Sequence, residues 1–250
     1  MHQLGAQTKL LLALGYLFTT AAMPEKAWKV YPVLLILIIC TAFLARIRLV
    51  SLIKRSLLAF PFHLAALPVL FTLPGDPCLI LSWSKFSIAV SAPGVNRFLA
   101  IGAKMWLCIQ AAALLTATTP MRQLLAAVDA LRAPKVLTAA AALMWRYLFV
   151  ISEEAVRLMR ARSSRSALLS EGQGGGSIAW RAKVTGGMAG SLFLRSLERS
   201  ERIYNAMQSR GYDGKIRTLP STQAEECAPL TLVIGGFLFA CLLLLGTLWQ

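Results

Sequence analysis

The chain has 250 residues and is 57% hydrophobic, with a mean hydropathy of +0.63. A soluble domain contains roughly 45–50% apolar residues, so the excess predicts that part of the chain lies in lipid. Its 26 lysines and arginines against 11 acidic residues give a net charge of +15. That charge excludes a chain buried wholly in hydrocarbon, where each charged group is strongly disfavoured. We therefore expect apolar spans joined to a basic region on the cytoplasmic side, by the positive-inside rule.

Residues 1–118 are predicted to form the N-terminal transmembrane helices. Their apolar stretches lie at residues 10–22, 30–44, 57–73 and 98–118. A span needs roughly 17–25 residues, so the shorter stretches must recruit flanking residues. The second stretch ends at a basic cluster made of Arg46, Arg48, Lys54 and Arg55. This cluster places its loop, and with it the N-terminus, in the cytoplasm.

Two features interrupt this N-terminal part. Pro61 and Pro68 fall within the third stretch, so kinks are expected there. Residues 79–90 are only moderately apolar, and we expect either an interfacial helix or a re-entrant segment. Whether that segment enters the bilayer stays open. No alternation of polar and apolar residues of useful length indicates a strand.

Residues 119–217 are predicted to form a cytoplasmic module of one short and two long helices. The short helix begins at Pro120 and ends near Arg132, and the long helices cover about 136–169 and 178–210. The first long helix is apolar in its first half and charged in its second, as expected of a helix that leaves the bilayer. The glycine-rich residues 172–177 form a flexible linker between the two long helices.

Residues 218–250 are predicted to contain a C-terminal transmembrane helix, from Pro229 to Trp249. Together these stretches predict an all-α integral membrane protein. It has about five transmembrane helices, with the helical module inserted before the last one.

The sequence predicts a protein without an active site of its own. His63 has no acid or cysteine at ligand spacing, and we interpret it as a packing residue in a kinked helix. His2 is a weak candidate for a transition-metal ligand, through its imidazole and the nearby backbone nitrogens. A phosphate-binding GxxxxGK[ST] loop is absent from the sequence, so the chain is not itself an ATPase. We expect no enzymatic activity and no cofactor bound by this chain.

Two arginine tripeptides stand at the ends of the long helices. They are Ala161-Arg162-Ser163 and Ser209-Arg210-Gly211, and Gly211 stands where a helix C-cap is expected. Small neighbours let another protein's backbone approach closely, and a guanidinium presents a planar fork of donors to carboxylates or carbonyls. From spacing alone they are better explained as ordinary arginines that complement the helix dipole.

Residues 118–214 resemble the CbiQ-type transmembrane (T) component of energy-coupling-factor transporters, in the cobalt/nickel branch. The N-terminal spans match that family only in layout and in the Lys9-Leu10-Leu11-Leu12-Ala13-Leu14 start. Within residues 118–214 the resemblance rests on the following segments: Thr118-Thr119-Pro120 with Leu124-Leu125, Leu131-Arg132-Ala133-Pro134, Met144-Trp145-Arg146-Tyr147-Leu148, Glu153-Glu154-Ala155, Arg160-Ala161-Arg162-Ser163, Arg195-Ser196-Leu197-Glu198-Arg199-Ser200-Glu201-Arg202 and Tyr204-Asn205-Ala206-Met207-Gln208-Ser209-Arg210-Gly211-Tyr212-Asp213-Gly214.

The family carries two Ala-Arg-Gly/Ser-like motifs that dock on a pair of ABC-type ATPase subunits. The resemblance implies that Ala161-Arg162-Ser163 is the first motif. It implies that Ser209-Arg210-Gly211, with serine in place of alanine, is the second. The implied partners are two ATPase subunits, which bind the ATP, and a membrane-embedded substrate-binding S component. The chain is then expected in a bacterial inner membrane, with its coupling helices in the cytoplasm, carrying the ATPase movement to the S component.

Several alternatives stay open at this point. Cobalt or nickel is the expected cargo, and a vitamin such as biotin is the alternative. A different reading is a membrane scaffold that binds anionic lipid through its basic helices without an ATPase. An ordinary ABC permease is disfavoured, because only Glu154-Ala155 resembles its glutamate-alanine-alanine loop. Nucleic acid is not an expected partner, since the basic residues come without a zinc-finger or RNA-binding motif.

Overall fold

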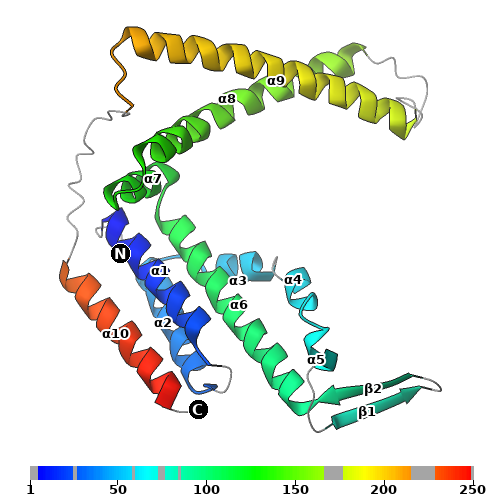
Figure 1. Ribbon diagram of the computed structural model, residues 1–250, viewed down its shortest axis with the longest axis vertical. Helices are drawn as coiled ribbons and strands as arrows, with labels where there is room; N and C mark the ends of the chain where they lie inside the picture. Colours follow the sequence, from blue (N-terminus) through cyan, green and yellow to red (C-terminus); the bar gives the residue numbers. More distant parts are fainter. Residues whose placement is uncertain are drawn as a thin grey trace. The chain divides into compact units, whose positions relative to one another are not determined.

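The computed structural model describes residues 5–24, 27–57, 60–72, 77–83, 86–165, 177–214 and 229–248. It divides into two compact units (Figure 1). The first unit is Met1–Leu131 with Ser221–Gln250, and the second is Arg132–Pro220. Within the described ranges the chain is helical except for one two-stranded hairpin, which confirms the predicted helical class.

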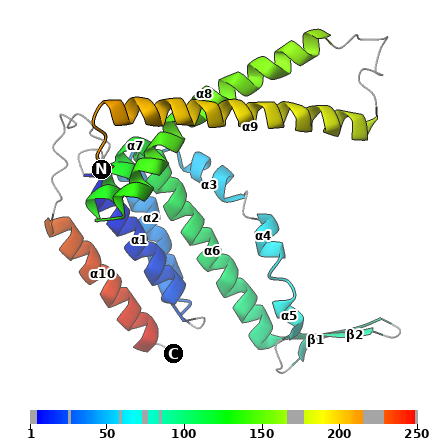
Figure 2. The ribbon, with the colours of Figure 1, turned by 45° about the horizontal axis from the view of Figure 1, so that its top comes forward.

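Four helices form the body of the first unit: α1 (Ala6–Ala22), α2 (Val30–Leu44), α6 (Ala92–Thr118) and α10 (Pro229–Leu248). Helix α1 packs against both α6 and α10, and α2 packs against α6. Figures 1 and 2 show α10 running beside α1, so that the last helix of the chain closes the bundle begun by the first. The buried centre holds Tyr16, Leu34, Ile38, Leu107 and Leu242.

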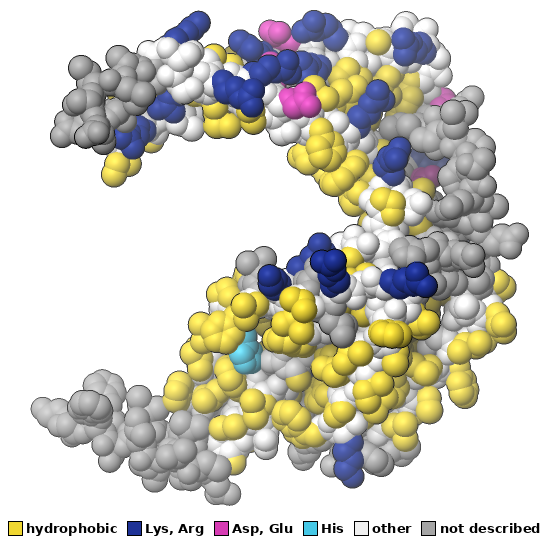
Figure 3. All heavy atoms as spheres, turned by 180° about the vertical axis from the view of Figure 1, so that it is seen from behind, with side chains coloured by type: hydrophobic (Ala, Val, Ile, Leu, Met, Phe, Trp, Pro, Cys, Tyr) yellow, Lys and Arg dark blue, Asp and Glu magenta, His cyan; other side chains and the backbone are white. Residues whose placement is uncertain are grey.

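The outside of this bundle is hydrophobic, as expected of a protein in lipid. Phe18, Phe43 and Phe237 are among its exposed large apolar side chains. In Figure 3 hydrophobic side chains cover most of the visible face of this unit, and Lys and Arg side chains gather along one edge. Exposing so many large apolar side chains to water is unfavourable, whereas the hydrocarbon of a lipid bilayer solvates them. The chain is therefore a membrane protein.

Of the described residues, three helices are long and apolar enough to cross a membrane. They are Ala92–Thr118, Lys135–Arg165 and Pro229–Thr247, and Val30–Leu44 is a shorter apolar helix. Lys135–Arg165 is the helix whose apolar first half was expected to begin in the bilayer. The total of about five spans stays a prediction.

The third apolar stretch is not the single kinked helix that was predicted. The stretch holds two short helices, α4 (Phe60–Leu64) and α5 (Val69–Thr72), and a third, α3 (Leu49–Leu57), ends where the stretch begins. Pro61 lies in the first turn of α4, where its missing N–H is tolerated. Pro68 directly precedes α5, and a proline disfavours the helical conformation of the residue before it. The chain therefore turns between α4 and α5 instead of continuing as a helix.

Residues 79–90, where an interfacial helix or a re-entrant segment was expected, lie in a β-hairpin. Strands β1 (Pro77–Trp83) and β2 (Phe86–Ser91) pair antiparallel, so the helical alternative is wrong. The sequence of β2 has the period of two that is typical of a strand, because Phe86, Ile88 and Val90 alternate with Ser87, Ala89 and Ser91. The hairpin leads directly into α6, whose N-terminus is capped by Ser91. The Ser91 Oγ accepts a hydrogen bond from the Gly94 N–H at 3.2 Å.

The short helix α7 (Met121–Ala130) falls in the first unit, although the sequence analysis grouped it with the long helices. Its Ala127 is buried against Ala6 and Leu10 of α1. Arg132, with φ of 62°, then takes a left-handed turn out of the helix. The chain continues after Pro134 into the second unit.

The second unit consists of two long helices, α8 (Lys135–Arg165) and α9 (Ile178–Ser209). The predicted linker at 172–177 lies almost wholly outside the described residues. Its last residue, Ser177, caps α9 by accepting a hydrogen bond from the Trp180 N–H at 3.3 Å.

Candidate functional site

Helices α8 and α9 run in opposite directions where they touch. A residue near the C-terminal end of α8 contacts the N-terminal part of α9, and a residue near the middle of α8 contacts the C-terminal part of α9. Two polar contacts between the helices define this pairing. One involves Glu154 near the middle of α8, and the other involves Arg162 near its end. Both contacts join residues at least 23 positions apart in the sequence.

The first contact is an ion-pair cluster that we call the Glu154 clamp, made of Glu154, Arg195 and Arg199. Glu154 Oε1 lies 3.4 Å from the Nη1 of Arg195, and Oε2 lies 3.2 Å from the Nη2 of Arg199. The two arginines are four residues apart and so share one face of α9. Only 17% of the Glu154 side chain is exposed, against 38% for Arg199 and 57% for Arg195. One nearly covered carboxylate therefore ties α8 to a full turn of α9.

The second contact holds the arginine of the first tripeptide. Arg162 Nη1 donates a hydrogen bond to the Thr185 Oγ1 at 3.3 Å. Its guanidinium carbon lies 5.9 Å from the centre of the Trp180 ring, within reach of a cation–π interaction. The Arg162 side chain is half-buried, while Ala161 and Ser163 on either side are exposed. The contacts with Thr185 and Trp180 thus fix the orientation of the guanidinium, and the small residues on either side of Arg162 stay exposed at the surface of α8.

The second tripeptide forms the end of α9. Gly211 has φ of 76°, the left-handed conformation that favours glycine. Its N–H donates to the Gln208 carbonyl at 2.9 Å, and the Tyr212 N–H donates to the Met207 carbonyl at 3.0 Å. These two bonds make a Schellman motif, which confirms the expected glycine cap. Arg210 is exposed at the last turn that this motif fixes.

The two tripeptides share a local design. The Ser163 hydroxyl donates to the Arg160 carbonyl at 2.8 Å, and the Ser209 hydroxyl donates to the Ala206 carbonyl at 3.0 Å. Each serine hydroxyl therefore bonds to the backbone of its own helix. The structure does not bring the arginines together. Arg162 contacts Thr185, and the helix from there to Arg210 is about 38 Å long at about 1.5 Å per residue.

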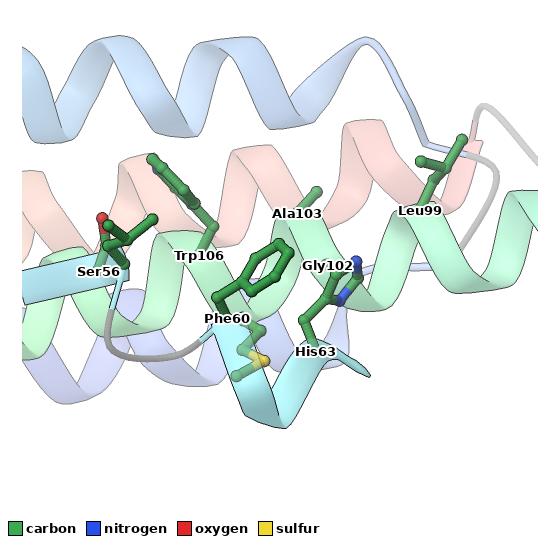
Figure 4. A pocket seen from close by; sticks show the side chains of 9 residues that line it. Ser56, Phe60, His63, Leu99, Gly102, Ala103 and Trp106 are labelled. Carbon is green, nitrogen blue, oxygen red and sulfur yellow. The ribbon is translucent and has the colours of Figure 1, made fainter. Parts of the chain in front are cut away.

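A separate apolar pocket of about 370 Å³ lies in the first unit, between α6 and the short helices α3 and α4. Figure 4 shows His63 of α4 beside Gly102 of α6. The His63 ring also lies 4.3 Å from the Phe98 ring, centre to centre. A Cβ added at Gly102 would collide with the imidazole ring. The interpretation of His63 as a packing residue is confirmed by these contacts.

Metal ligands do not gather in the part of the chain that the structure describes. Within it, no three His, Cys, Asp or Glu side chains come close enough to hold an ion together. The buried Nδ1 of His63 has no hydrogen-bond partner among the described residues. His2, the weak metal candidate, lies outside the described residues.

Sequence reasoning missed the Glu154 clamp and the Trp180–Thr185 contact of Arg162. The spacing of Arg195 and Arg199 did signal a shared helix face. Nothing local indicates that Glu154, more than 40 positions earlier, meets that face.

Comparison with known proteins identifies the family. The model of the CbiQ family, described as cobalt transport protein, matches residues 1–221. A cobalt transport protein CbiQ of Rhodobacter capsulatus is 25% identical over 240 residues, covering 96% of this chain and 91% of its own length. The energy-coupling factor transporter transmembrane protein EcfT of Limosilactobacillus fermentum is 29% identical over 187 residues, 70% of this chain and 67% of that protein.

A third relative is longer than this chain. An uncharacterized protein of Methanocaldococcus jannaschii is 27% identical over 180 residues, which are 70% of this chain but only 59% of that protein. The match to the family model, in contrast, extends through both structural units and covers both arginine tripeptides. The chain therefore belongs to the CbiQ cobalt transport protein family.

Proposed function

We propose that this chain is the transmembrane coupling subunit, or T component, of an energy-coupling-factor importer. In this function it transmits the movement of two ABC-type ATPase subunits to a substrate-binding membrane subunit. The observation that carries the proposal is the pair of arginine tripeptides, one on each long helix, held on two helices that are tied by the Glu154 clamp. The name of the Limosilactobacillus relative supports membership in such a transporter.

Docking of the ATPases is the first part of the proposal. Arg162 and Arg210 each lie between small residues at a helix end, and their fork of donors suits carboxylates or carbonyls of a groove. Because the two arginines are separated by most of the length of α9, one ATPase subunit binds at each end. ATP is bound by those subunits, and this chain supplies no catalytic group.

Transmission to the membrane partner is the second part. The first half of α8 exposes large apolar side chains, among them Leu137, Met144 and Phe149. On α9, Phe193 and Leu194 are exposed as well. Such faces bind either lipid or another apolar helix, in the helix-in-groove manner. The S component contacts these faces, so that a movement of α8 and α9 reaches the substrate-binding subunit.

Cobalt is the cargo that we propose, with nickel as the next choice and a vitamin such as biotin as the alternative. The family description and the Rhodobacter relative's name support cobalt. The cargo binds to the S component in this proposal, so the T component needs no ion site. The complex lies in a bacterial inner membrane, with α8 and α9 on its cytoplasmic side.

Co-purification tests the proposal. The tagged chain is expressed in its native cells and solubilised in mild detergent, and its partners are identified by mass spectrometry. We expect ABC-type ATPase subunits and one small membrane protein. Arg162→Glu with Arg210→Glu should remove the ATPases and keep the membrane partner, since reversing a docked charge costs roughly 2–5 kcal/mol of binding.

The matched control is Arg202→Glu, which reverses another exposed arginine on α9 outside both tripeptides. It should retain the ATPases. An ATPase that is missing from the wild type, or that stays on the double variant, contradicts the coupling function and favours the lipid-binding scaffold. Uptake of radioactive cobalt in competition with nickel and biotin then identifies the cargo.

A further inference from the structure

Helix α3 (Leu49–Leu57) has three distinct faces, which is unusual for a helix of nine residues. One face is buried in the protein, a second is apolar and exposed, and a third is cationic. A helix with this division suits the boundary between hydrocarbon and lipid headgroups.

The buried face anchors α3 on the bundle. Leu52 is only 3% exposed and packs in one cluster with Ala42 near the end of α2 and Ala113 near the end of α6. Ser56, one turn later on the same face, is buried and donates a hydrogen bond to the Ile53 carbonyl at 2.8 Å. In Figure 1 α3 runs across α6 instead of along it. Because it packs on Ala42 and Ala113, near the ends of α2 and α6, it lies at one end of the bundle.

The second face is apolar and open. Val50, Ile53 and Leu57 are three and four residues apart, so they share one side of the helix. Their exposed fractions are 62%, 51% and 63%. Three large apolar side chains at this exposure need a cover, and acyl chains next to the bundle provide it.

The third face and the residues just before the helix carry the basic cluster: Lys54 and Arg55 lie on α3, and Arg46 and Arg48 precede it. Arg46, Arg48, Lys54 and Arg55 are all exposed. The sequence from residue 27 to residue 75 contains no acidic residue, and neither do α2 and α6, the helices against which α3 packs. The four cations thus fall within a segment of ten residues, and α2, α3 and α6 bring no carboxylate to it. Their mutual repulsion favours a partner that brings several negative charges.

We propose that α3 and the basic cluster form a binding surface for anionic phospholipids. The headgroup phosphates bind Arg46, Arg48, Lys54 and Arg55, and the acyl chains cover Val50, Ile53 and Leu57. A lipid fits better than an acidic protein surface, because the cationic and apolar faces adjoin on one short helix. An amphiphile with an anionic head and an apolar tail satisfies both faces at once. The inference is independent of the ATPase partners and applies to the isolated subunit.

Photocrosslinking in nanodiscs tests this surface. The full chain is placed in phosphatidylcholine nanodiscs that contain a trace of phosphatidylglycerol with a diazirine near its headgroup. A parallel sample carries phosphatidylcholine with the same diazirine. Mass spectrometry of the digest then measures the crosslinks on residues 46–57. We expect phosphatidylglycerol to label this peptide at least about fivefold more than phosphatidylcholine, and about 1 M salt to remove most of the excess.

Variants separate this surface from general basic charge. Lys54→Gln with Arg55→Gln should reduce the excess several-fold, while Lys54→Arg with Arg55→Lys should retain it. The matched control, Lys9→Gln with Arg122→Gln, removes two cations elsewhere in the first unit and should leave labelling of residues 46–57 unchanged. Equal labelling by the two lipids in the wild type would overturn the proposal. So would an excess that survives the Gln pair at Lys54 and Arg55, or one that falls equally in the control. If the Gln pair does not insert, the wild-type comparison and its salt dependence decide alone.

Discussion

Replacing Glu154 by glutamine tests whether the clamp controls how α8 and α9 cross. Glutamine keeps the shape of the side chain and removes its charge, so both charge-assisted hydrogen bonds weaken. Exposed ion pairs contribute about 0.2–1 kcal/mol each, and solvent reaches both arginines here. We therefore expect a loss of about 1 kcal/mol in the α8–α9 association, a change of roughly fivefold in its equilibrium constant.

The structural assay is a distance measurement by double electron–electron resonance. In a cysteine-free background, spin labels at Met144 and Tyr204, both exposed and both away from the clamp, report the spread between the helices. Glu154→Gln should broaden their distance distribution. In the assembled transporter it should reduce uptake more than it reduces ATP hydrolysis, because Arg162 and Arg210, the proposed docking residues, are untouched.

The matched control is Glu153→Gln. Glu153 pairs with Arg157 inside α8 at 4.0 Å, and both side chains are largely exposed, so this change leaves the contact between the helices intact. Glu154→Arg combined with Arg199→Glu should restore part of the wild-type distribution. The reasoning is refuted if Glu154→Gln and Glu153→Gln give the same distance distribution and the same ratio of uptake to hydrolysis.

Three further changes have expected outcomes. Gly211→Ala places a Cβ on a residue in the left-handed conformation, at a cost of about 1–2 kcal/mol. Hydrogen exchange at the end of α9 should become faster, and fewer ATPase subunits should co-purify. Gly186→Ala, where a Cβ meets open space within the same helix, should change neither measurement. Gly102→Ala pushes on the His63 ring, so the melting temperature in detergent should fall by an amount equivalent to about 1–3 kcal/mol, and His63→Ala in the same chain should recover part of it. Trp180→Ala removes the cation–π contact with Arg162, which is worth about 0.5–1 kcal/mol. Amide hydrogen exchange in the last turn of α8 should therefore become a few-fold faster. Unchanged exchange in that turn would show that Thr185 alone holds Arg162.

Helix caps and helix breaks, which depend on residues close together in the sequence, could be predicted from the sequence. Gly211 was expected to cap α9, and the Schellman hydrogen bonds confirm it. The break at Pro134 and the long helices on either side of the glycine linker followed from composition and proline rules alone. The apolar excess and the clustered cations likewise predicted a membrane protein before any coordinates.

Structural features that depend on the packing of one helix on another could not be predicted from the sequence. Residues 57–73 passed as one apolar span, because hydropathy does not register that Pro68 stops a helix at its preceding residue. The short helix α7 was grouped with the long ones, although its Ala127 packs on α1. The clamp was missed for the same reason, since a contact between Glu154 and Arg199 is fixed by the packing of two helices and leaves no local pattern.

The position of the clamp along the helices bears on how a movement at the arginines reaches the membrane. From Glu154 to Arg162 α8 extends about 12 Å, and from Glu154 back to Lys135 it extends about 28 Å, at about 1.5 Å per residue. If α8 pivots at the clamp, the contact of Arg162 with Thr185 has to open, and a displacement of the Arg162 end is then roughly doubled at the apolar end of α8. A single carboxylate holding two arginines is suited to such a pivot, because the ion pairs tolerate a change of angle that a close-packed apolar contact resists. In the proposed coupling function, the unequal arms would turn a small displacement at Arg162 into a larger one where the exposed apolar residues of α8 lie.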